Sequence, residues 1–299
     1  MKPIVTIGVC VKNGASTIFE TIKSINFQDY PHELMEVIFV DDGSKDNTLS
    51  IINIYAHKMN IITKIFSQEW KGLGPARNIV INNAEGKYIL WVDSDMIIYR
   101  DYVTKLVYFM DINTNVAISK GEIYITPDLN WISELEIYTR NRMNVDFNTD
   151  LTKSMGTGGS IYRVEAIKKL GGFNENLKGY GEDWDAEFRL RNAGWKFYII
   201  KSCVFSDYER FGLTWNIIWY KYVKQGIDSY KLSCINKEII KFYRWIPPSA
   251  LLGGFFYSLT IYKIKRRKIA FLLPILSFFK SFALCYGLIK GYLNKNIFN

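Results

Sequence analysis

The chain has 299 residues, of which 48% are hydrophobic and 22% charged, a composition that excludes wholesale disorder. Its net charge of +9 is distributed unevenly along the sequence. Residues 210–299 hold 15 Lys and Arg against 2 acidic residues, a net +13, whereas residues 1–209 hold 23 basic and 27 acidic residues, a net −4. Long apolar stretches interrupt the basic region, a pattern that favours a membrane surface over nucleic acid as its partner.

Cysteine and histidine are too sparse for the commonest metal and redox sites. The four cysteines, at positions 10, 203, 234 and 285, form no Cys-x-x-Cys pair, which is typical of reduced thiols in the cytosol. The only histidines, His32 and His57, lie early in the chain and are expected to be surface residues. A metal site would therefore use Asp and Glu oxygens, which suit Mg²⁺ or Mn²⁺ better than Zn²⁺.

Strand and helix patterns alternate over the first hundred residues. Short apolar runs predict strands at residues 4–9, 37–41, 61–66 and 88–93. The spacing of apolar residues predicts one helix that begins near Ser16, a second around residues 49–55 and a third over residues 72–83. This alternation is typical of an α/β domain of Rossmann-like character, with a mostly parallel sheet flanked by helices.

The middle of the chain is less regular. The predicted strands are residues 116–125 and 196–205, and the predicted helices are residues 131–144, 166–170 and 183–192. Residues 155–159 read Met-Gly-Thr-Gly-Gly, which predicts a flexible glycine loop.

Two apolar stretches, residues 246–262 and 269–289, follow near the end of the chain. Lys280 lies inside the second, and the basic run 263–268 separates the two. If both crossed a bilayer, this basic run would lie on the far side, against the tendency of Lys and Arg to stay cytoplasmic. We therefore expect a helical hairpin on the cytoplasmic face of the cell membrane, with membrane-crossing helices as the alternative.

Acidic residues gather at three places, residues 41–42, 93–95 and 182–183. The first two directly follow apolar runs and so stand where predicted buried strands end. Carboxylates at strand ends converge at one edge of an α/β sheet, which is where such sheets bind ligands. Because clustered carboxylates repel one another, the pattern favours a metal-assisted site for a phosphorylated ligand over simple helix capping.

Several of these segments together resemble family-2 glycosyltransferases with the GT-A fold. The matching segments are residues 5–9, 40–44, 74–78, 86–89, 93–95, 171–173 and 181–184. They cover roughly residues 4–205 in the right order and spacing, which is more specific than any single motif. The resemblance implies that residues 1–208 form a GT-A catalytic domain, followed by a basic helical connector, 209–244, and α-helical membrane-associating segments, 245–299.

The resemblance also implies roles for individual residues. The expected nucleotide-binding residues are Val11, Asn13, Asp41, Asp42, Arg77 and Asp93. Asp93 and Asp95 are expected to hold Mn²⁺ or Mg²⁺ against the diphosphate of a nucleotide sugar. Asp183 is expected to be the general base, with Glu182 beside it.

A departure from the family concerns the third metal ligand. Many relatives carry a histidine about twenty residues after the base, and no histidine follows His57 here. Asp207 or a water is the candidate replacement, which would give an all-oxygen shell. Gly158 and Gly159 are expected near the sugar and acceptor; Trp184 is expected either to stack on a sugar or to belong to the core.

The reading that these residues favour is a metal-dependent, inverting glycosyltransferase. It would use a nucleoside-diphosphate sugar, with UDP favoured, and a hydroxyl of a membrane-associated glycan or polyprenyl-linked acceptor. Two alternatives remain: a polyprenyl-phosphate sugar synthase, and a catalytically silent protein that binds sugar nucleotides. A dinucleotide-binding dehydrogenase is disfavoured because residues 12–15, Lys-Asn-Gly-Ala, lack its glycine pattern.

Overall fold

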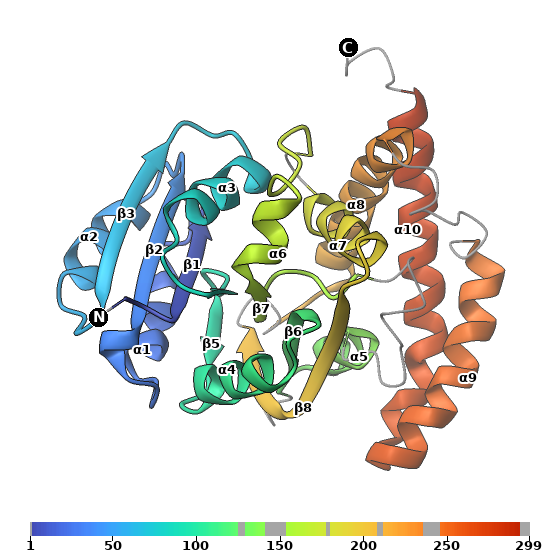
Figure 1. Ribbon diagram of the computed structural model, residues 1–299. Helices are drawn as coiled ribbons and strands as arrows, with labels where there is room; N and C mark the ends of the chain where they lie inside the picture. Colours follow the sequence, from blue (N-terminus) through green and yellow to red (C-terminus); the bar gives the residue numbers. More distant parts are fainter. Residues whose placement is uncertain are drawn as a thin grey trace. The chain divides into compact units, whose positions relative to one another are not determined.

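The computed structural model describes residues 2–124, 129–140, 154–177, 180–207, 212–235 and 246–293. The chain divides into two compact units (Figure 1). The first comprises Met1–Tyr124 and Asp146–Tyr208, and the second comprises Ile125–Val145 and Glu209–Asn299. The division expected from the sequence, 1–208, 209–244 and 245–299, differs in residues 125–145, which lie in the middle of the sequence but join the second unit.

The first unit is built on an eight-stranded sheet with the order β3-β2-β1-β4-β7-β6-β8-β5. The strands are β1 (Val5–Val11), β2 (Met35–Asp42), β3 (Ile62–Gln68), β4 (Tyr88–Trp91), β5 (Met96–Ile98), β6 (Val116–Ile123), β7 (Ser160–Arg163) and β8 (Lys196–Asp207). Parallel pairing joins β3, β2, β1 and β4, as expected from the strand–helix alternation, and also joins β6 to β8.

Two short strands make the sheet mixed and were not expected from the sequence. β7 pairs antiparallel with β4 and β6, and β5 pairs antiparallel with β8. They have four and three residues, which is too short for a period-two pattern to stand out. β7 also begins directly after the glycine loop, so its pairing with β4 brings that loop to the edge where β4 ends.

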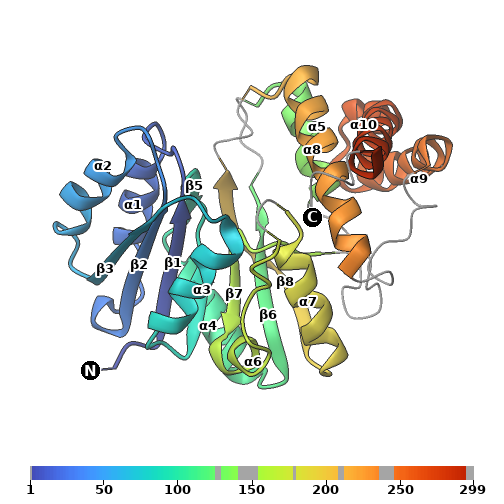
Figure 2. The ribbon, with the colours of Figure 1, turned by 90° about the horizontal axis from the view of Figure 1, so that it is seen from above.

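Helices cover both faces of this sheet, with α1 and α2 on one face and α3 on the other (Figures 1 and 2). Their bounds are α1 (Ile18–Asn26), a 3-10 helix (His32–Leu34), α2 (Thr48–Ala56), α3 (Leu73–Asn83), α4 (Tyr102–Ile112), α6 (Val164–Lys169) and α7 (Glu182–Asn192). The helix predicted to begin near Ser16 is α1, which begins at Ile18 with Thr17 rather than Ser16 at its N-cap, and α4 was not predicted. β2 is buried along its whole length, as a strand covered on both faces must be.

The second unit consists of α5 (Trp131–Arg140), α8 (Trp215–Ile235), α9 (Pro247–Lys265), a 3-10 helix (Lys268–Leu272) and α10 (Leu273–Leu293). Its core is apolar, with Leu135 of α5 and Leu276 of α10 among the buried residues. Gly226 and Gly287 let α8 and α10 approach closely, because a Cβ on Gly287 would lie 2.1 Å from a backbone oxygen of α8. Residues 141–144 of the predicted helix over 131–144 lie outside the described residues.

Two buried carboxylates of α5 hold the C-terminal helices. Glu136 lies 2.8 Å from the ammonium of Lys280, and it also accepts a hydrogen bond from Tyr222 at 2.8 Å. Glu134 accepts two hydrogen bonds from the guanidinium of Arg267, at 3.0 and 2.9 Å. Burial alone would raise the pKa of Glu136, but the positive charges of Lys280 and Arg140 hold it well below its usual range. The ammonium group of Lys280, which lies within the apolar stretch 269–289, therefore points into the protein.

One helix in the described part of the chain, Lys268–Leu293, is long and apolar enough to cross a membrane. The stretch predicted at residues 246–262 lies within α9, which does not meet the same criterion. Both helices expose apolar side chains at helical spacing. On α10 these are Ile275, Phe278, Phe282, Tyr286 and Ile289.

Candidate functional site

The carboxyl ends of β1, β2 and β4 meet at one edge of the sheet. Val11, the last residue of β1, is paired with Asp41 of β2, and the N–H of Val92 donates to the carbonyl of Gly8 in β1 at 3.0 Å. The acidic segments at 41–42 and 93–95 therefore flank β1 on its two sides. Val11 is itself buried in the sheet.

Asn13 fixes the loop that follows β1. Its side-chain oxygen accepts a hydrogen bond from the N–H of Lys45 at 2.8 Å, and its own N–H donates to Ser44 Oγ at 2.9 Å. The residue has a φ of 54°, a left-handed conformation that asparagine adopts more readily than most residues. Asn13 thus joins the loops after β1 and β2, the two loops expected to border a nucleotide.

The two aspartates at the end of β2 have different surroundings. Asp42 accepts hydrogen bonds from Gln68 and from the N–H groups of Lys71 and Gly72, so its carboxylate is occupied in shaping the entry to α3. Asp41 accepts one bond, from the N–H of Ser44 at 3.2 Å, and its Oδ1 is buried with no hydrogen-bond partner among the described residues. Because buried acceptors are normally satisfied, Asp41 is the better candidate to bind a ligand.

Arg77 of α3 and Glu182 of α7 form a buried ion pair, although they are 105 positions apart in the sequence. Burial lowers the pKa of Arg77, but the negative charges of Glu182, Asp183 and Asp93 raise it above its usual value. Burial raises the pKa of Glu182, the positive charge of Arg77 lowers it, and the negative charge of Asp183 raises it. The resulting pKa is about 7. Arg77 therefore experiences the charges of two of the three predicted acidic segments, 93–95 and 182–183.

Residues 93–95 form the turn between β4 and β5. Thr21 of α1 donates to the carbonyl of Ser94 at 2.9 Å and fixes this turn against the first helix. Asp93 and Asp95 are both half-buried. Asp95 precedes Met96, whose backbone pairs with Asp207, so the strand register places Asp207 beside the turn; the side chain of Asp207 lies outside the described part of the structure.

The residues of this turn suit a hard divalent cation. Their donors are carboxylate oxygens at the open edge of the sheet, the donor type that Mg²⁺ and Mn²⁺ prefer. Among the described side chains, which do not include Asp207, no group of three or more His, Cys, Asp or Glu is close enough to hold a metal ion. A cation here would therefore depend on additional oxygens from a diphosphate, from water or from Asp207.

Asp183 is the second residue of α7, close to the helix N-terminus, where a negative charge is favoured. One of its oxygens accepts a hydrogen bond from the N–H of Trp184 at 2.7 Å. The other lies near the glycine loop, because a Cβ on Gly156 would be 3.6 Å from Asp183 Oδ2. A Cβ on Gly158 would be only 2.2 Å from Asp93 Oδ2. One short loop therefore lies beside both the expected base and the expected metal ligand.

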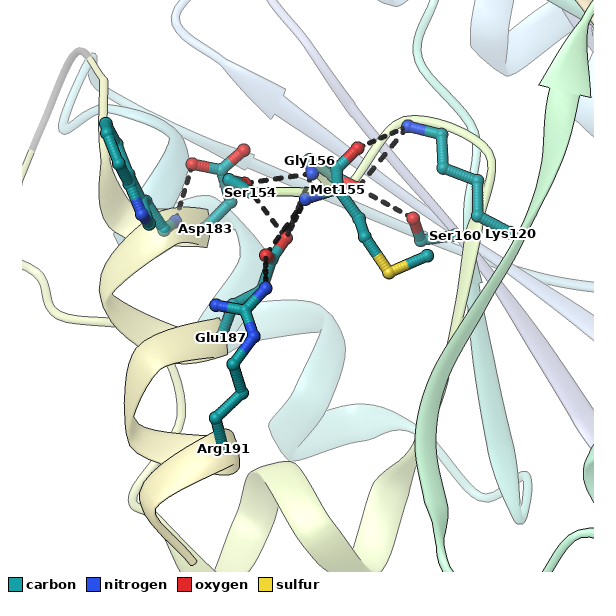
Figure 3. Close-up of polar contacts among 9 residues, drawn as sticks. Lys120, Ser154, Met155, Gly156, Ser160, Asp183, Glu187 and Arg191 are labelled. Carbon is teal, nitrogen blue, oxygen red and sulfur yellow. Dashed lines mark hydrogen bonds and ion pairs between the residues drawn. The ribbon is translucent and has the colours of Figure 1, made fainter. Parts of the chain in front are cut away.

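The glycine loop is held from two sides (Figure 3). Glu187 of α7 accepts hydrogen bonds from the N–H groups of Met155 and Gly156, both at 2.9 Å. Lys120 of β6 donates to the carbonyl of Met155 at 2.8 Å. Gly159, at the other end of the loop, donates its N–H to the carbonyl of Trp91 at 2.8 Å. These contacts indicate an ordered loop rather than a flexible connector.

The predicted site residues have two outcomes, and two further residues near the site were not predicted. The structure brings together Asp93, Asp183, Arg77, Glu182 and Gly158 through the loop and the ion pair described above. It places Trp184 in a buried position, with 6% of its surface exposed, which supports packing in the core rather than stacking on a sugar. Lys120 and Glu187 were missed. A signal for Glu187 exists, since an acidic residue four positions after Asp183 lies on the same helix face.

Comparisons with known proteins identify the family of the first unit. A family model described as Glycosyl transferase family 2 matches residues 6–171. An uncharacterized glycosyltransferase of Rickettsia prowazekii is 30% identical over 214 residues, which cover 70% of this chain and 62% of that protein. The poly(ribitol-phosphate) beta-N-acetylglucosaminyltransferase TarS of Staphylococcus aureus is 35% identical over 99 residues, or 33% of this chain and 17% of TarS. The chain thus spans less than two thirds of these curated relatives.

Solved structures show the same fold at low identity. A mannosyltransferase from Pyrobaculum calidifontis, PcManGT, in complex with GDP-Man and Mn²⁺, has a TM-score of 0.70 at 16% identity, covering 99% of this chain and 88% of that one. Residues 1–349 of S. aureus TarS, in complex with UDP-GlcNAc, have a TM-score of 0.54 at 16% identity, covering 98% and 92%. The fold expected from the sequence, α/β of the GT-A type with a C-terminal helical extension, is confirmed.

Proposed function

The chain belongs to glycosyl transferase family 2, and from this premise we propose that it transfers a sugar, with inversion, from a nucleoside-diphosphate sugar to a hydroxyl. The observation that supports this proposal is the glycine loop that lies beside both Asp183 and Asp93. UDP is the favoured nucleotide. The acceptor is a membrane-associated glycan or lipid, in keeping with the poly(ribitol-phosphate) acceptor in the name of TarS.

Each residue then has a distinct task. Asp41 and Asn13 border the base and ribose of the nucleotide, and Arg77, fixed by Glu182, closes that side of the pocket. Asp183 accepts the proton of the acceptor hydroxyl as its oxygen attacks the anomeric carbon, and the bond to the diphosphate breaks on the opposite face, which inverts the configuration. A divalent cation bound at Asp93 and Asp95 would supply positive charge that stabilises the leaving diphosphate.

Release of nucleoside diphosphate from a panel of sugar nucleotides tests the proposed activity. The panel begins with UDP-GlcNAc and GDP-mannose, the ligand types of the two structural neighbours. We expect release that requires Mn²⁺ or Mg²⁺ and is lost on addition of EDTA. Binding of a sugar nucleotide, seen as protection against thermal unfolding, without any release would instead support the silent binding protein.

Asp95→Asn is expected to lower metal-dependent release at least about 100-fold, because it replaces one of the two carboxylates proposed to bind a hard cation by a neutral amide. The measurement is the initial rate across a Mn²⁺ titration. Asp101→Asn is a matched control, since Asp101 is an exposed aspartate that precedes α4. Wild-type rate and metal affinity in Asp95→Asn would contradict the assignment of the metal site.

The apolar and basic surface of α9 and α10 supports a membrane partner. The exposed stripe on α10 recurs every three or four residues, whereas Lys280 faces away from it toward Glu136. A helix whose central charged side chain is bound inside the protein, and whose other side is apolar, is suited to lie in the interface. The cluster of Lys and Arg at residues 263–268 adds attraction to anionic lipid on the cytoplasmic face.

The double variant Leu252→Asp/Phe256→Asp is expected to weaken binding to anionic vesicles at least about 10-fold, because it places two charges in the apolar face. These side chains are 62% and 66% exposed on α9, so folding should be spared. Tyr108→Asp/Ile112→Asp is the matched control, with the same spacing on α4 and exposures of 69% and 63%. Vesicle co-sedimentation measures the effect; equal sedimentation of both variants, or a tag at Arg266 that is accessible only outside the cell, would contradict the proposal.

A further inference from the structure

A buried carboxylate that the transfer chemistry does not use lies one helical turn after the proposed base. Glu187 has no exposed surface and is four residues after Asp183 on α7. It accepts hydrogen bonds from Ser154 Oγ at 3.0 Å and from the N–H groups of Met155 and Gly156 at 2.9 Å. Its counter-charge is Arg191, whose guanidinium lies 3.0 Å away and over the ring of Phe197.

The opposite side of the same peptide groups is held by other side chains. Lys120 donates to the carbonyl of Met155 at 2.8 Å, and Ser160 donates to the carbonyl of Gly156 at 2.6 Å. The N–H groups of this segment thus face a carboxylate, and its carbonyls face an ammonium and a hydroxyl (Figure 3). Such a set of contacts specifies one conformation of the loop rather than merely filling space.

Burying this carboxylate and its ion pair costs more free energy than burying apolar side chains of similar size would. A buried carboxylate is tolerated only with good partners, and replacing a buried ion pair by apolar side chains is often neutral or stabilising. The contacts act on Gly156, whose φ of +71° is strained for other residues and whose added Cβ would stand 3.6 Å from Asp183 Oδ2. Glu187 therefore fixes the part of the loop that lies next to the base.

We propose that Glu187 is a positioning residue for the transfer step. It holds residues 154–156 next to Asp183. The loop then allows the acceptor hydroxyl to approach this base from one direction only. The proposal rests on the proposed function and adds a residue that touches neither donor nor metal. Positioning errors of about 1 Å reduce turnover by about 100-fold, whereas the binding of a donor held by other residues is little changed.

Glu187→Gln keeps the shape of the side chain but turns an amide group, with its own N–H donors, toward the N–H groups of the loop. We expect kcat to fall about 100-fold while KM for the sugar nucleotide stays within about 2-fold. We also expect the Met155 and Gly156 amides to exchange hydrogen at least about 10-fold faster, because only one of the two acceptor oxygens remains and a competing N–H donor replaces the other. Glu165→Gln is the matched control, since Glu165 pairs with Lys169 at the same spacing but on the exposed surface of α6.

The rates are measured with the sugar nucleotide and metal that give the fastest release by the wild-type protein, and amide exchange is measured on the same samples. Unchanged kcat in a folded Glu187→Gln protein, faster loop exchange without loss of turnover, or a parallel loss of donor affinity would each overturn the proposal. If Glu187→Gln does not fold, Ser154→Ala decides: it removes one donor to Glu187, so kcat should fall several-fold with KM unchanged. A wild-type protein that releases no nucleoside diphosphate would sink the proposed function itself, which is a different result.

Discussion

Asp183→Asn is expected to reduce sugar transfer to a hydroxyl by about 10²–10⁴-fold, the usual contribution of a general base. Asparagine preserves the size of the side chain but cannot accept the acceptor proton. Donor binding should persist, because the contacts assigned to the nucleotide come from β1, β2 and α3 rather than from α7. The measurements are turnover in the presence of the membrane-derived acceptor, and protection by the sugar nucleotide against thermal unfolding.

The same variant separates two acceptor classes. A lipid phosphate barely needs a base, so a polyprenyl-phosphate sugar synthase would keep its activity in Asp183→Asn. Asp101→Asn serves again as the control, because it also removes an aspartate charge from a helix N-terminus. Full activity of Asp183→Asn with a polyprenyl phosphate would contradict the hydroxyl acceptor proposed above and would select the synthase.

Arg77→Met is expected to lower the free energy of unfolding by about 3–5 kcal/mol, because it leaves Glu182 buried without its counter-charge. Both side chains are almost fully buried, so solvent screens the pair little. The loss should be smaller at pH 5 than at pH 8. Burial raises the pKa of Glu182 to about 7 even beside Arg77, and a carboxyl group with a raised pKa destabilises the folded state as the pH rises above its unfolded value.

The double variant Arg77→Met/Glu182→Met is the test of that explanation. Removing both charges together should recover most of the lost stability, while donor binding stays impaired because the guanidinium is still absent. Chemical denaturation at the two pH values measures the stability, and thermal protection by the nucleotide measures the binding. A double variant no more stable than Arg77→Met would show that the unpaired carboxylate is not the cause.

The parts of the fold that the sequence predicts well are those with a strong local pattern. Residues 37–40 are continuously apolar and form the centre of β2, and residues 72–83 carry the glycine and proline signals with which α3 begins. β5, β7 and α4 were missed. The two short strands form by pairing with strands that are distant in the sequence, so their own residues carry little signal. Helix α4 was not predicted.

The site divides in the same way. Asp93 and Asp95 were predicted from their place at a strand end, and Asp183 from the resemblance to the family; their roles stay predictions. The partnership of Arg77 with Glu182 spans 105 positions, and that of Glu136 with Lys280 spans 144, so no local pattern indicates either. The sequence could not decide whether Trp184 stacks on a sugar or packs in the core, because its burial depends on residues that only tertiary packing brings around it. The proposed positioning role of Glu187 likewise depends on hydrogen bonds to a loop more than thirty positions earlier.

The membership of α5 in the helical unit has a practical consequence for anyone who wishes to isolate the sugar-transferring part. Ending the chain at residue 208 would strip α5 of Arg267 and Lys280, leaving two carboxylates and an apolar flank uncovered. A well-behaved fragment would also have to omit residues 125–145 and bridge Tyr124 to Asp146. Isolating this unit therefore requires an internal deletion as well as a truncation after residue 208.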